Sequence, residues 1–518
     1  MWVALAFMLA LTAGSAASGA VRVDSGWLQG VREGGLTVYR GVPFAAPPVG
    51  PLRWREPVPA PPWRGVRRVD AFAPACMQKG VSMPGEDPPR ISEDCLYLNI
   101  WTPARATKAR PPVPLPVIVW IYGGGFTNGS ASMSLYWGDR LARKGAVVVT
   151  IAYRLGAFGF LALPELTAES PHRSSGNYAT LDQIAALGWV KRNIAAFGGD
   201  PGRVTIAGQS AGAASVSILT ASPLARGLFQ RAIAESGGVF EPIKLAPGYG
   251  LANAEKDGQA WAASLGARSL AQLRALPAAA VLAAKGDAVT HPVIDPWVLP
   301  ASPYEVFAAG RQNDVPMLVG SNADEARSLV ANKDKIKAAT FAADIAKAWG
   351  PLPPQLLAPY PHATDAQAVS ARLAFERDLR FAWDDWTWAR LQAVTGRNPV
   401  YYYHFAHAPP FPVGSVYAGW GPSHFAELWY VFDHLDQQPW RWTSADRALA
   451  DAMSSYWVNF ARSGDPNGPG LPRWPRFDPA SPRVLWLDQP IAVGPVANLD
   501  TLTVFDAVYA GVRGAPVP

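Results

Sequence analysis

A serine at the apex of a strand, a tight turn and a helix is the feature that most constrains this chain. The apolar run 204–207 precedes the motif Gly208 to Gly212 (GQSAG), and a helix-compatible run follows at 213–219. The turn is so tight that a side chain at either glycine would collide with neighbouring backbone. We therefore expect the Ser210 hydroxyl to stand clear of a sheet at a helix N-terminus, where backbone N–H groups favour negative charge.

A second glycine run lies upstream of this serine. The apolar residues 117–121 lead into Tyr122, Gly123, Gly124 and Gly125. Consecutive glycines let the backbone turn its N–H groups inward, although the same run also suits a flexible turn. Its position ahead of the serine motif favours the interpretation in which this loop completes an oxyanion hole.

These motifs belong to a longer series of ordered matches. The chain resembles the type-B carboxylesterases and lipases, the family that includes the cholinesterases, from about Val23 to about Phe505. The resemblance implies an α/β-hydrolase fold, in which a central, mostly parallel twisted sheet has helices on both faces and helical insertions cover the active site. Three residues depart from the family pattern, namely Ala152, Ala179 and Pro296. The further matching stretches are 39–45 (YRGVPFA), 47–54 (PPVGPLRW), 92–100 (SEDCLYLNI), 147–161 (VVVTIAYRLGAFGFL), 176–183 (GNYATLDQ) and 197–212 (FGGDPGRVTIAGQSAG).

The α/β-hydrolases order their catalytic residues as serine, acid and histidine. The stretch 320–325 (GSNADE) follows the apolar run 315–319 and is similar to the family's acid loop, with Glu325 at the acid position. Asp324 is the alternative, since a neighbouring carboxylate could serve sterically. Successive side chains point in different directions, so only one can meet the imidazole, and the motif alignment favours Glu325.

Seven histidines compete for the role of general base. A lone histidine is more often a surface or structural residue, but His424 lies in 421–428 (GPSHFAEL), which is similar to the family's base motif. The resemblance therefore implies a triad of Ser210, Glu325 and His424. His424 would take the serine proton and return it to the leaving alcohol, while Glu325 holds the imidazole in the useful tautomer.

The same resemblance assigns an oxyanion hole to the backbone N–H groups of Gly124, Gly125 and Ala211. Loss of one such donor typically costs ~10² to 10³ in rate. We expect no cofactor and no metal site.

The length of 518 residues would suggest about three domains by simple division. However, α/β folds often devote such length to insertions around one sheet, and the chain has no low-complexity linker or internal repeat. We therefore expect one α/β-hydrolase domain over residues 21–518. The segments 240–308 and 333–394 have helix-like spacing and are expected to cover the site, where substrate choice is made.

The N-terminus predicts export. Residues 2–11 are apolar, small residues follow as far as Ala20, and the stretch is too short to span a bilayer. We interpret residues 1–20 as a secretory signal peptide, with cleavage after Ala17 or Ala20, and expect a periplasmic or secreted protein. The two cysteines agree with export, because the resemblance implies a disulfide between Cys76 and Cys95.

The formal net charge of +6 comes from scattered basic residues, with the densest group at Arg64, Arg67 and Arg68. Because no nucleic-acid motif accompanies them, solvated surface charge is the default interpretation. We expect a small-molecule ester as the partner, no nucleic acid and no integral membrane segment. The resemblance also implies two internal ion pairs: Arg53 with Glu93, and Arg154 with Asp182.

Several classes of function can be compared. An esterase is favoured over a non-catalytic cholinesterase-like binding protein, because such proteins lack the serine or the histidine. A cholinesterase is disfavoured, since the loop 77–94 offers no aromatic ring to a quaternary ammonium and position 209 is a neutral Gln. We expect a serine carboxylesterase that acts on neutral esters of short to medium acyl chains. A lipase acting on longer acyl glycerol esters is the alternative.

Overall fold

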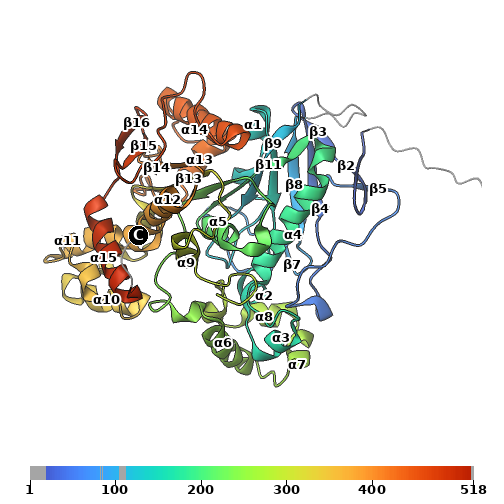
Figure 1. The fold of residues 1–518 in the computed structure, drawn as a ribbon, viewed down its shortest axis with the longest axis horizontal. Helices are drawn as coiled ribbons and strands as arrows, with labels where there is room; N and C mark the ends of the chain where they lie inside the picture. The colour runs from blue at the N-terminus through green and yellow to red at the C-terminus, as the bar shows by residue number, and fades with distance from the viewer. Residues whose placement is uncertain (1–18, 82, 85, 104–112, 515–518) are drawn as a thin grey trace, which may run out of the picture.

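One large sheet organises the molecule. The computed structural model describes residues 19–81, 83–84, 86–103 and 113–514. Within these ranges an 11-stranded sheet has helices on both faces (Figure 1), as the resemblance implies. In spatial order its strands are β16 (Ala492–Pro495), β15 (Arg483–Leu487), β14 (Val400–Phe405), β13 (Met317–Asn322), β12 (Arg231–Glu235), β11 (Gly199–Gln209), β9 (Leu115–Ile121), β10 (Val147–Ile151), β8 (Tyr97–Thr102), β4 (Leu36–Pro43) and β3 (Val31–Glu33).

The centre of this sheet is parallel and mostly buried. Neighbouring strands pair in parallel from β10 to β15, whereas the outer pairs on both sides are antiparallel. Every residue of β10 is buried, and its sequence VVVTI is rich in β-branched residues. Such continuous apolar runs suit strands that helices cover on both faces. The parallel strands bring their carboxyl ends to one edge of the sheet.

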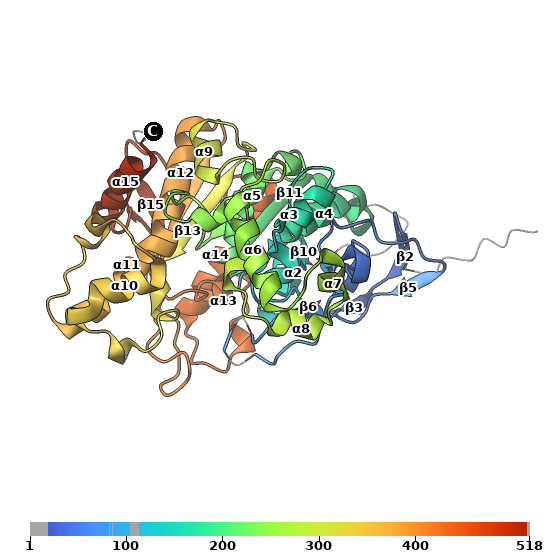
Figure 2. The same cartoon turned by 90° about the horizontal axis from the view of Figure 1, so that it is seen from below.

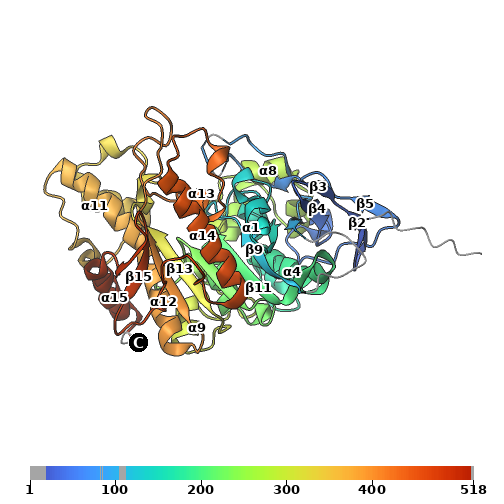
Figure 3. The same ribbon diagram turned by 90° about the horizontal axis from the view of Figure 1, so that it is seen from above.

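Helices form a layer on each face of the sheet. Figures 1 and 3 show α1, α13 and α14 on one face, and α4, α5, α9 and α12 on the other. The longest, α14, begins after the capping residue Thr443 and is followed by the C-terminal cap Gly464, whose φ of 81° suits glycine. The bounds of these helices are α1 (Asp139–Arg143), α4 (Tyr178–Asn193), α5 (Ala211–Ala221), α9 (Pro303–Ala308), α12 (Trp383–Thr395), α13 (Leu428–Val431) and α14 (Ser444–Ser463).

The remaining helices lie outside these two layers. Figure 2 shows α6 to α8 beside α2 and α3, where they share a hydrophobic cluster that includes Trp54 and Trp261. At another side of the molecule α10 and α11 lie near α15. These helices are α2 (Gly156–Phe160), α3 (Pro164–Glu169), α6 (Leu251–Ser264), α7 (Leu270–Ala275), α8 (Ala278–Ala283), α10 (Phe341–Trp349), α11 (Asp365–Arg377) and α15 (Leu499–Arg513).

The two segments expected to cover the site are helical, but only some of their helices lie outside the layers on the sheet. Within 240–308, α6 to α8 lie outside the sheet layers, whereas α9 packs against α5 and α12. Within 333–394, α12 contacts β13 and β14 and therefore belongs to the layer on the sheet. Helical spacing alone does not distinguish a helix on a sheet from one in a cover, because both need one apolar face.

Smaller elements surround the first strands. A three-stranded sheet contains β1 (Val21–Val23), β2 (Gly26–Gln29) and β5 (Val66–Arg68), and β6 (Ala75–Cys76) pairs with β7 (Ile91–Ser92). A disulfide joins Cys76 to Cys95. Both expected internal ion pairs are confirmed: Arg53 with Glu93 at 2.6 Å, and Arg154 with Asp182 at 2.7 Å.

The predicted signal peptide falls almost wholly on residues 1–18, which lie outside the described residues. It stays a prediction. In the part of the chain that the structure describes, no helix has the length and apolar character to cross a bilayer.

Candidate active site

Ser210 occupies a sharp turn between β11 and α5. Its backbone has φ of 58° and ψ of −125°, a conformation that residues other than glycine rarely adopt. Its N–H donates to the Glu235 carbonyl at 2.9 Å, and its carbonyl accepts from Ala214 at 2.9 Å inside α5. Hydrogen bonds on both sides thus hold a strained serine at the carboxyl edge of the sheet, and strain of this kind collects at functional sites.

The two glycines of the turn are required by close packing. A Cβ at Gly208 would lie 2.5 Å from the Gly212 carbonyl oxygen, and a Cβ at Gly212 would overlap the Ile121 carbonyl oxygen of β9. Neither oxygen can retreat, because both belong to the backbone. The tightness that the sequence predicts at these positions is therefore confirmed.

Gly212→Ala is expected to destabilise the fold by about 3 kcal/mol or more, because β9 and α5 would have to separate. Activity should fall at least about tenfold as the serine shifts. Thermal denaturation and ester turnover measure both effects. The matched control is Gly511→Ala in α15, where nothing lies within 4 Å of the added Cβ; it should leave stability unchanged or raise it by up to about 1 kcal/mol. Equal stability of the two variants would contradict the packing argument.

The upstream glycine run lies directly against the serine. A Cβ at Gly123 would lie 2.9 Å from the Ser210 Cβ, and Gly124 and Gly125 have φ of 110° and 60°. Within the described ranges, the N–H groups of Gly124, Gly125 and Ala211 donate no hydrogen bond. Three backbone donors, two in the glycine run and one in the residue after the serine, are therefore available to an external acceptor.

His424 and Glu325 meet beside this turn. The imidazole Nδ1 donates to the Glu325 carboxylate, with Nδ1 2.6 Å from Oε2. The side chains of Glu325 and His424 are 0% and 2% exposed, so water does not compete for this bond. The pairing assigns the proton to Nδ1 and leaves Nε2 as an acceptor.

Asp324, the alternative acid, points elsewhere. Its carboxylate pairs with Arg327 at 3.2 Å, and both side chains are more than one third exposed. The structure therefore places Glu325, and not its neighbour, against the imidazole.

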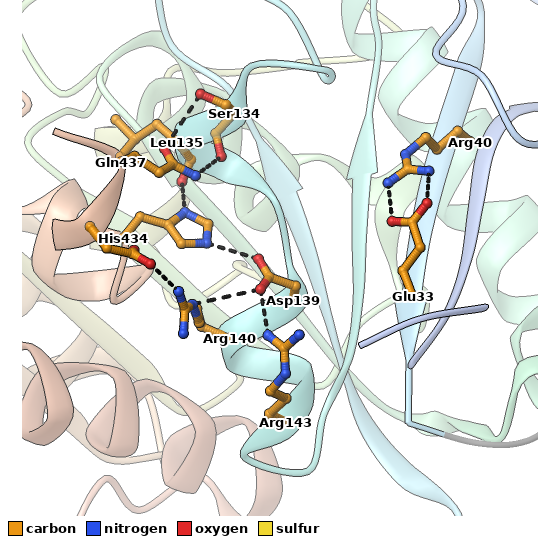
Figure 4. A network of polar contacts seen from close by, with 10 residues as sticks. Glu33, Arg40, Ser134, Leu135, Asp139, Arg140, Arg143, His434 and Gln437 are labelled. Atoms are coloured by element: carbon orange, nitrogen blue, oxygen red, sulfur yellow. Dashed lines mark hydrogen bonds and ion pairs between the residues drawn. The ribbon is translucent and has the colours of Figure 1, made fainter. Parts of the chain in front are cut away.

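The other six histidines have structural surroundings. Figure 4 shows His434 between the Leu135 carbonyl oxygen, 3.0 Å from Nδ1, and Asp139, 2.9 Å from Nε2. Burial would raise the pKa of Asp139, but His434 and Arg143 together lower it to about 2. Burial also lowers the pKa of His404 to about 4. The remaining four lie against ring or polar partners: His172 against Trp297, His291 against Tyr249, His362 against Phe341, and His407 against Asp446.

The chain is similar to known proteins over most of its length. The model of the carboxylesterase family matches residues 17–497. The chain belongs to the carboxylesterase family. It is 36% identical to the fumonisin B1 esterase of Sphingopyxis macrogoltabida over 479 residues, which cover 88% of this chain and 84% of that protein.

Two further relatives extend the comparison. The medium-chain fatty acyl-CoA hydrolase precursor of Anas platyrhynchos is 34% identical over 86% of this chain and 83% of its own length. The solved structure of PNB esterase superposes with a TM-score of 0.80 at 31% identity, covering 94% of this chain and all of the other. The chain is therefore a carboxylic ester hydrolase with an α/β-hydrolase fold.

Sequence reasoning missed three side chains that this carboxylesterase places around His424. Phe381 stacks on the imidazole at 4.5 Å between ring centres, and Phe425 meets it edge-on at 4.5 Å. The Gln209 amide nitrogen lies 3.3 Å from Nε2. Phe381 comes from a π-helical turn, Asp378–Ala382, between α11 and α12. Nothing in the sequence pattern indicated that turn.

The Ser210 hydroxyl makes no hydrogen bond in the described part of the chain. In esterases without substrate, catalytic hydrogen bonds are often long and tighten only in the complex. The same described residues contain no cluster of three His, Cys, Asp or Glu side chains that could hold a metal ion.

A cavity of about 500 Å³ is lined by Gly129 and Ser130, which follow the glycine run, and by Trp429, which follows His424 in the chain, although neither Ser210 nor His424 lines it. Its walls include Glu86, Ser130, Tyr417 and Trp429. Burial and the neighbouring Asp87 raise the pKa of Glu86 to about 7. Two aromatic residues from outside the loop 77–94 therefore line the same cavity as a carboxyl group from that loop, an arrangement that the sequence did not predict.

Proposed function

We propose that this carboxylesterase cleaves esters through an acyl-enzyme at Ser210, with His424 as general base and acid and Glu325 orienting the imidazole. The observation that carries the proposal is the 2.6 Å bond between His424 Nδ1 and Glu325. Gln209, the residue before the serine, contacts the same ring, so the imidazole lies at the turn that holds the nucleophile.

The chemistry follows from these positions. His424 Nε2 takes the Ser210 proton as Oγ attacks the ester carbonyl carbon, and Glu325 stabilises the resulting imidazolium. The N–H groups of Gly124, Gly125 and Ala211 bind the oxyanion of the tetrahedral intermediate. Collapse of this intermediate breaks the ester C–O bond, and His424 gives its proton to the leaving alcohol. Water then attacks the acyl-enzyme with His424 again as base, releasing the acid and free Ser210.

Turnover of p-nitrophenyl esters from acetate to palmitate tests this function and its acyl preference. We expect the highest kcat/KM with short to medium acyl chains, and the relative named for medium-chain acyl groups supports this choice. A maximum of kcat/KM at palmitate, together with a turnover rate that increases sharply above the solubility limit of the ester, would favour the lipase alternative. No turnover of any ester would favour a non-catalytic binding protein.

Uncharged esters are expected to be better substrates than choline esters, by several-fold to about thirty-fold in kcat/KM. The loop 77–94 lacks an aromatic residue and Gln209 is neutral. A cation would therefore lose its solvation without gaining a contact with a ring face, which stabilises a bound cation by ~0.5 to 2 kcal/mol. The measurement compares butyrylthiocholine with an uncharged thioester of equal length at low salt. Preference for the choline ester would contradict the neutral-ester proposal and would mean that an aromatic residue outside the loop 77–94 binds the cation.

We also propose export of the protein, with cleavage of its signal peptide after Ala17 or Ala20. The apolar N-terminal stretch and the disulfide between Cys76 and Cys95 support this localisation. The mass of the mature protein tests it, with a new N-terminus expected at Ser18 or Val21. An uncleaved chain retained with the cytoplasmic fraction would contradict export.

A further inference from the structure

Two loops must meet correctly for the imidazole to face its acid. The acid loop follows β13, and the base loop follows β14 and carries His424. Two backbone hydrogen bonds join them: Asp324 N–H donates to the Pro422 carbonyl at 3.0 Å, and His424 N–H donates to the Glu325 carbonyl at 3.3 Å. The relative position of the loops therefore decides the geometry of the Glu325–His424 pair.

One side chain also joins the two loops. Asn322, the last residue of β13, is 0% exposed. Its amide nitrogen Nδ2 donates to the Ser423 carbonyl at 2.8 Å and to the Glu427 carboxyl group. Its backbone N–H donates to Glu325 Oε1 at 2.7 Å. A single residue thus contacts the acid itself and both sides of His424 in the base loop.

The partner Glu427 is equally buried, at 0% exposed. Burial, together with the charge of Glu325, raises the pKa of Glu427 well above its usual range. Two other acids at the same edge behave alike: burial raises the pKa of Glu235 to about 8, and it raises that of Asp385 well above the ordinary value. A neutral Glu427 can accept a hydrogen bond from Asn322 without adding a second negative charge beside Glu325.

We propose that Asn322 is a positioning residue of the triad: its amide holds the base loop, through Ser423 and Glu427, to the end of the strand that leads into the acid loop. The inference rests on the proposed function, since it concerns the same Ser210, Glu325 and His424. Asn322 contacts Glu325 and the residues beside His424 but not Ser210, so its side chain acts on the reaction through the position of His424 against Glu325.

Asn322→Ala removes both side-chain bonds but keeps the backbone bond to Glu325. The base loop then loses its hydrogen bonds from the side chain at position 322, and His424 is aligned with Ser210 for a smaller fraction of the time. We expect kcat to fall about 10- to 100-fold with KM changed less than about twofold, because misplacement of a catalytic group lowers turnover and leaves substrate binding intact. Stopped-flow and steady-state hydrolysis of p-nitrophenyl butyrate measure the two constants.

A matched control separates positioning from general stability. Asn99 in β8 is also buried, and its amide donates to the Ala131 carbonyl at 3.1 Å and to Thr150 at 3.0 Å. Asn99→Ala should lower the melting temperature about as much as Asn322→Ala while kcat per active site stays within about twofold of the parent. Titration with an organophosphonate gives the concentration of active sites in each preparation.

A reciprocal exchange gives the sharper test. In Asn322→Asp the two N–H donors of the amide are replaced by a carboxyl group with at most one O–H, while the shape is kept, so at least one of the two bonds is lost and kcat should fall toward that of the Ala variant. In the double variant Asn322→Asp/Glu427→Gln, the amide of residue 427 can donate to the new carboxyl group, which restores one of the two bonds in the opposite direction. We expect the double variant to regain at least about fivefold in kcat over Asn322→Asp, and Glu427→Gln alone to lose less than Asn322→Asp.

The outcomes are separable. If Asn322→Ala and Asn322→Asp keep parental kcat per titrated site, or if kcat falls equally in Asn99→Ala, the positioning role is wrong. Additive losses in the exchange would also overturn it. These results leave the proposed function standing as long as Ser210→Ala is inactive, whereas an active Ser210→Ala would remove the proposed function itself.

Discussion

Ser210→Ala is expected to lower ester turnover by about 10⁴- to 10⁶-fold, because the substitution removes the only atom of this site that can attack the ester. The residual rate comes from the backbone donors that still bind the oxyanion. The strained backbone at φ of 58° is held by hydrogen bonds of the backbone itself, so the fold should remain intact. Steady-state kinetics and thermal denaturation measure the two quantities.

Ser217→Ala is the matched control for this substitution. Ser217 is buried in the same helix, and its hydroxyl donates to the Ala214 carbonyl at 2.7 Å. This variant should keep parental turnover. An organophosphonate should also label one serine peptide, the one that contains Ser210, and the label should be absent from Ser210→Ala. Labelling at another serine, or parental activity in Ser210→Ala, would show that the nucleophile has been misassigned.

The parts of the fold that could be predicted from the sequence are those in which a short stretch determines its own geometry. Gly208 and Gly212 are the clearest example. A turn that admits no Cβ at these two positions is compatible with few local structures other than a strand, a serine at the apex and a helix. The run Val147 to Ile151 likewise indicates a strand buried on both faces. The choice of Glu325 over Asp324 depended on alignment with a family motif and not on local pattern.

The remaining parts depend on contacts between distant segments. Phe381 reaches His424 only because a π-helical turn rotates it inward, and no periodicity predicts a single added residue in a helix. Asn322 and Glu427 are 105 residues apart, so their hydrogen bond follows from the pairing of β13 with β14. The sequence also did not distinguish α9 and α12, which belong to the layer on the sheet, from α6 to α8, which lie outside it. An amphipathic pattern does not specify which surface buries the apolar face.

His424→Ala and Glu325→Gln are each expected to lower kcat by about 10⁴-fold or more, and the double variant should be within about tenfold of His424→Ala alone. The two side chains act as one unit: without the imidazole, the carboxylate has no proton transfer to assist, so its removal costs little more. The 2.6 Å bond between Nδ1 and Oε2 and the burial of both groups make this coupling strong. A double-mutant cycle on p-nitrophenyl butyrate measures it.

Asp324→Asn completes this test, because it changes the neighbouring carboxylate while leaving the pair intact. Asp324 contacts Arg327 in a partly exposed ion pair, whose loss costs little, so turnover should change less than about tenfold. Losses that simply multiply in the double variant would mean that Glu325 acts independently of the base. A larger loss at Asp324 than at Glu325 would mean that the acid loop rearranges when substrate binds, so that the other carboxylate meets the imidazole in the reacting complex.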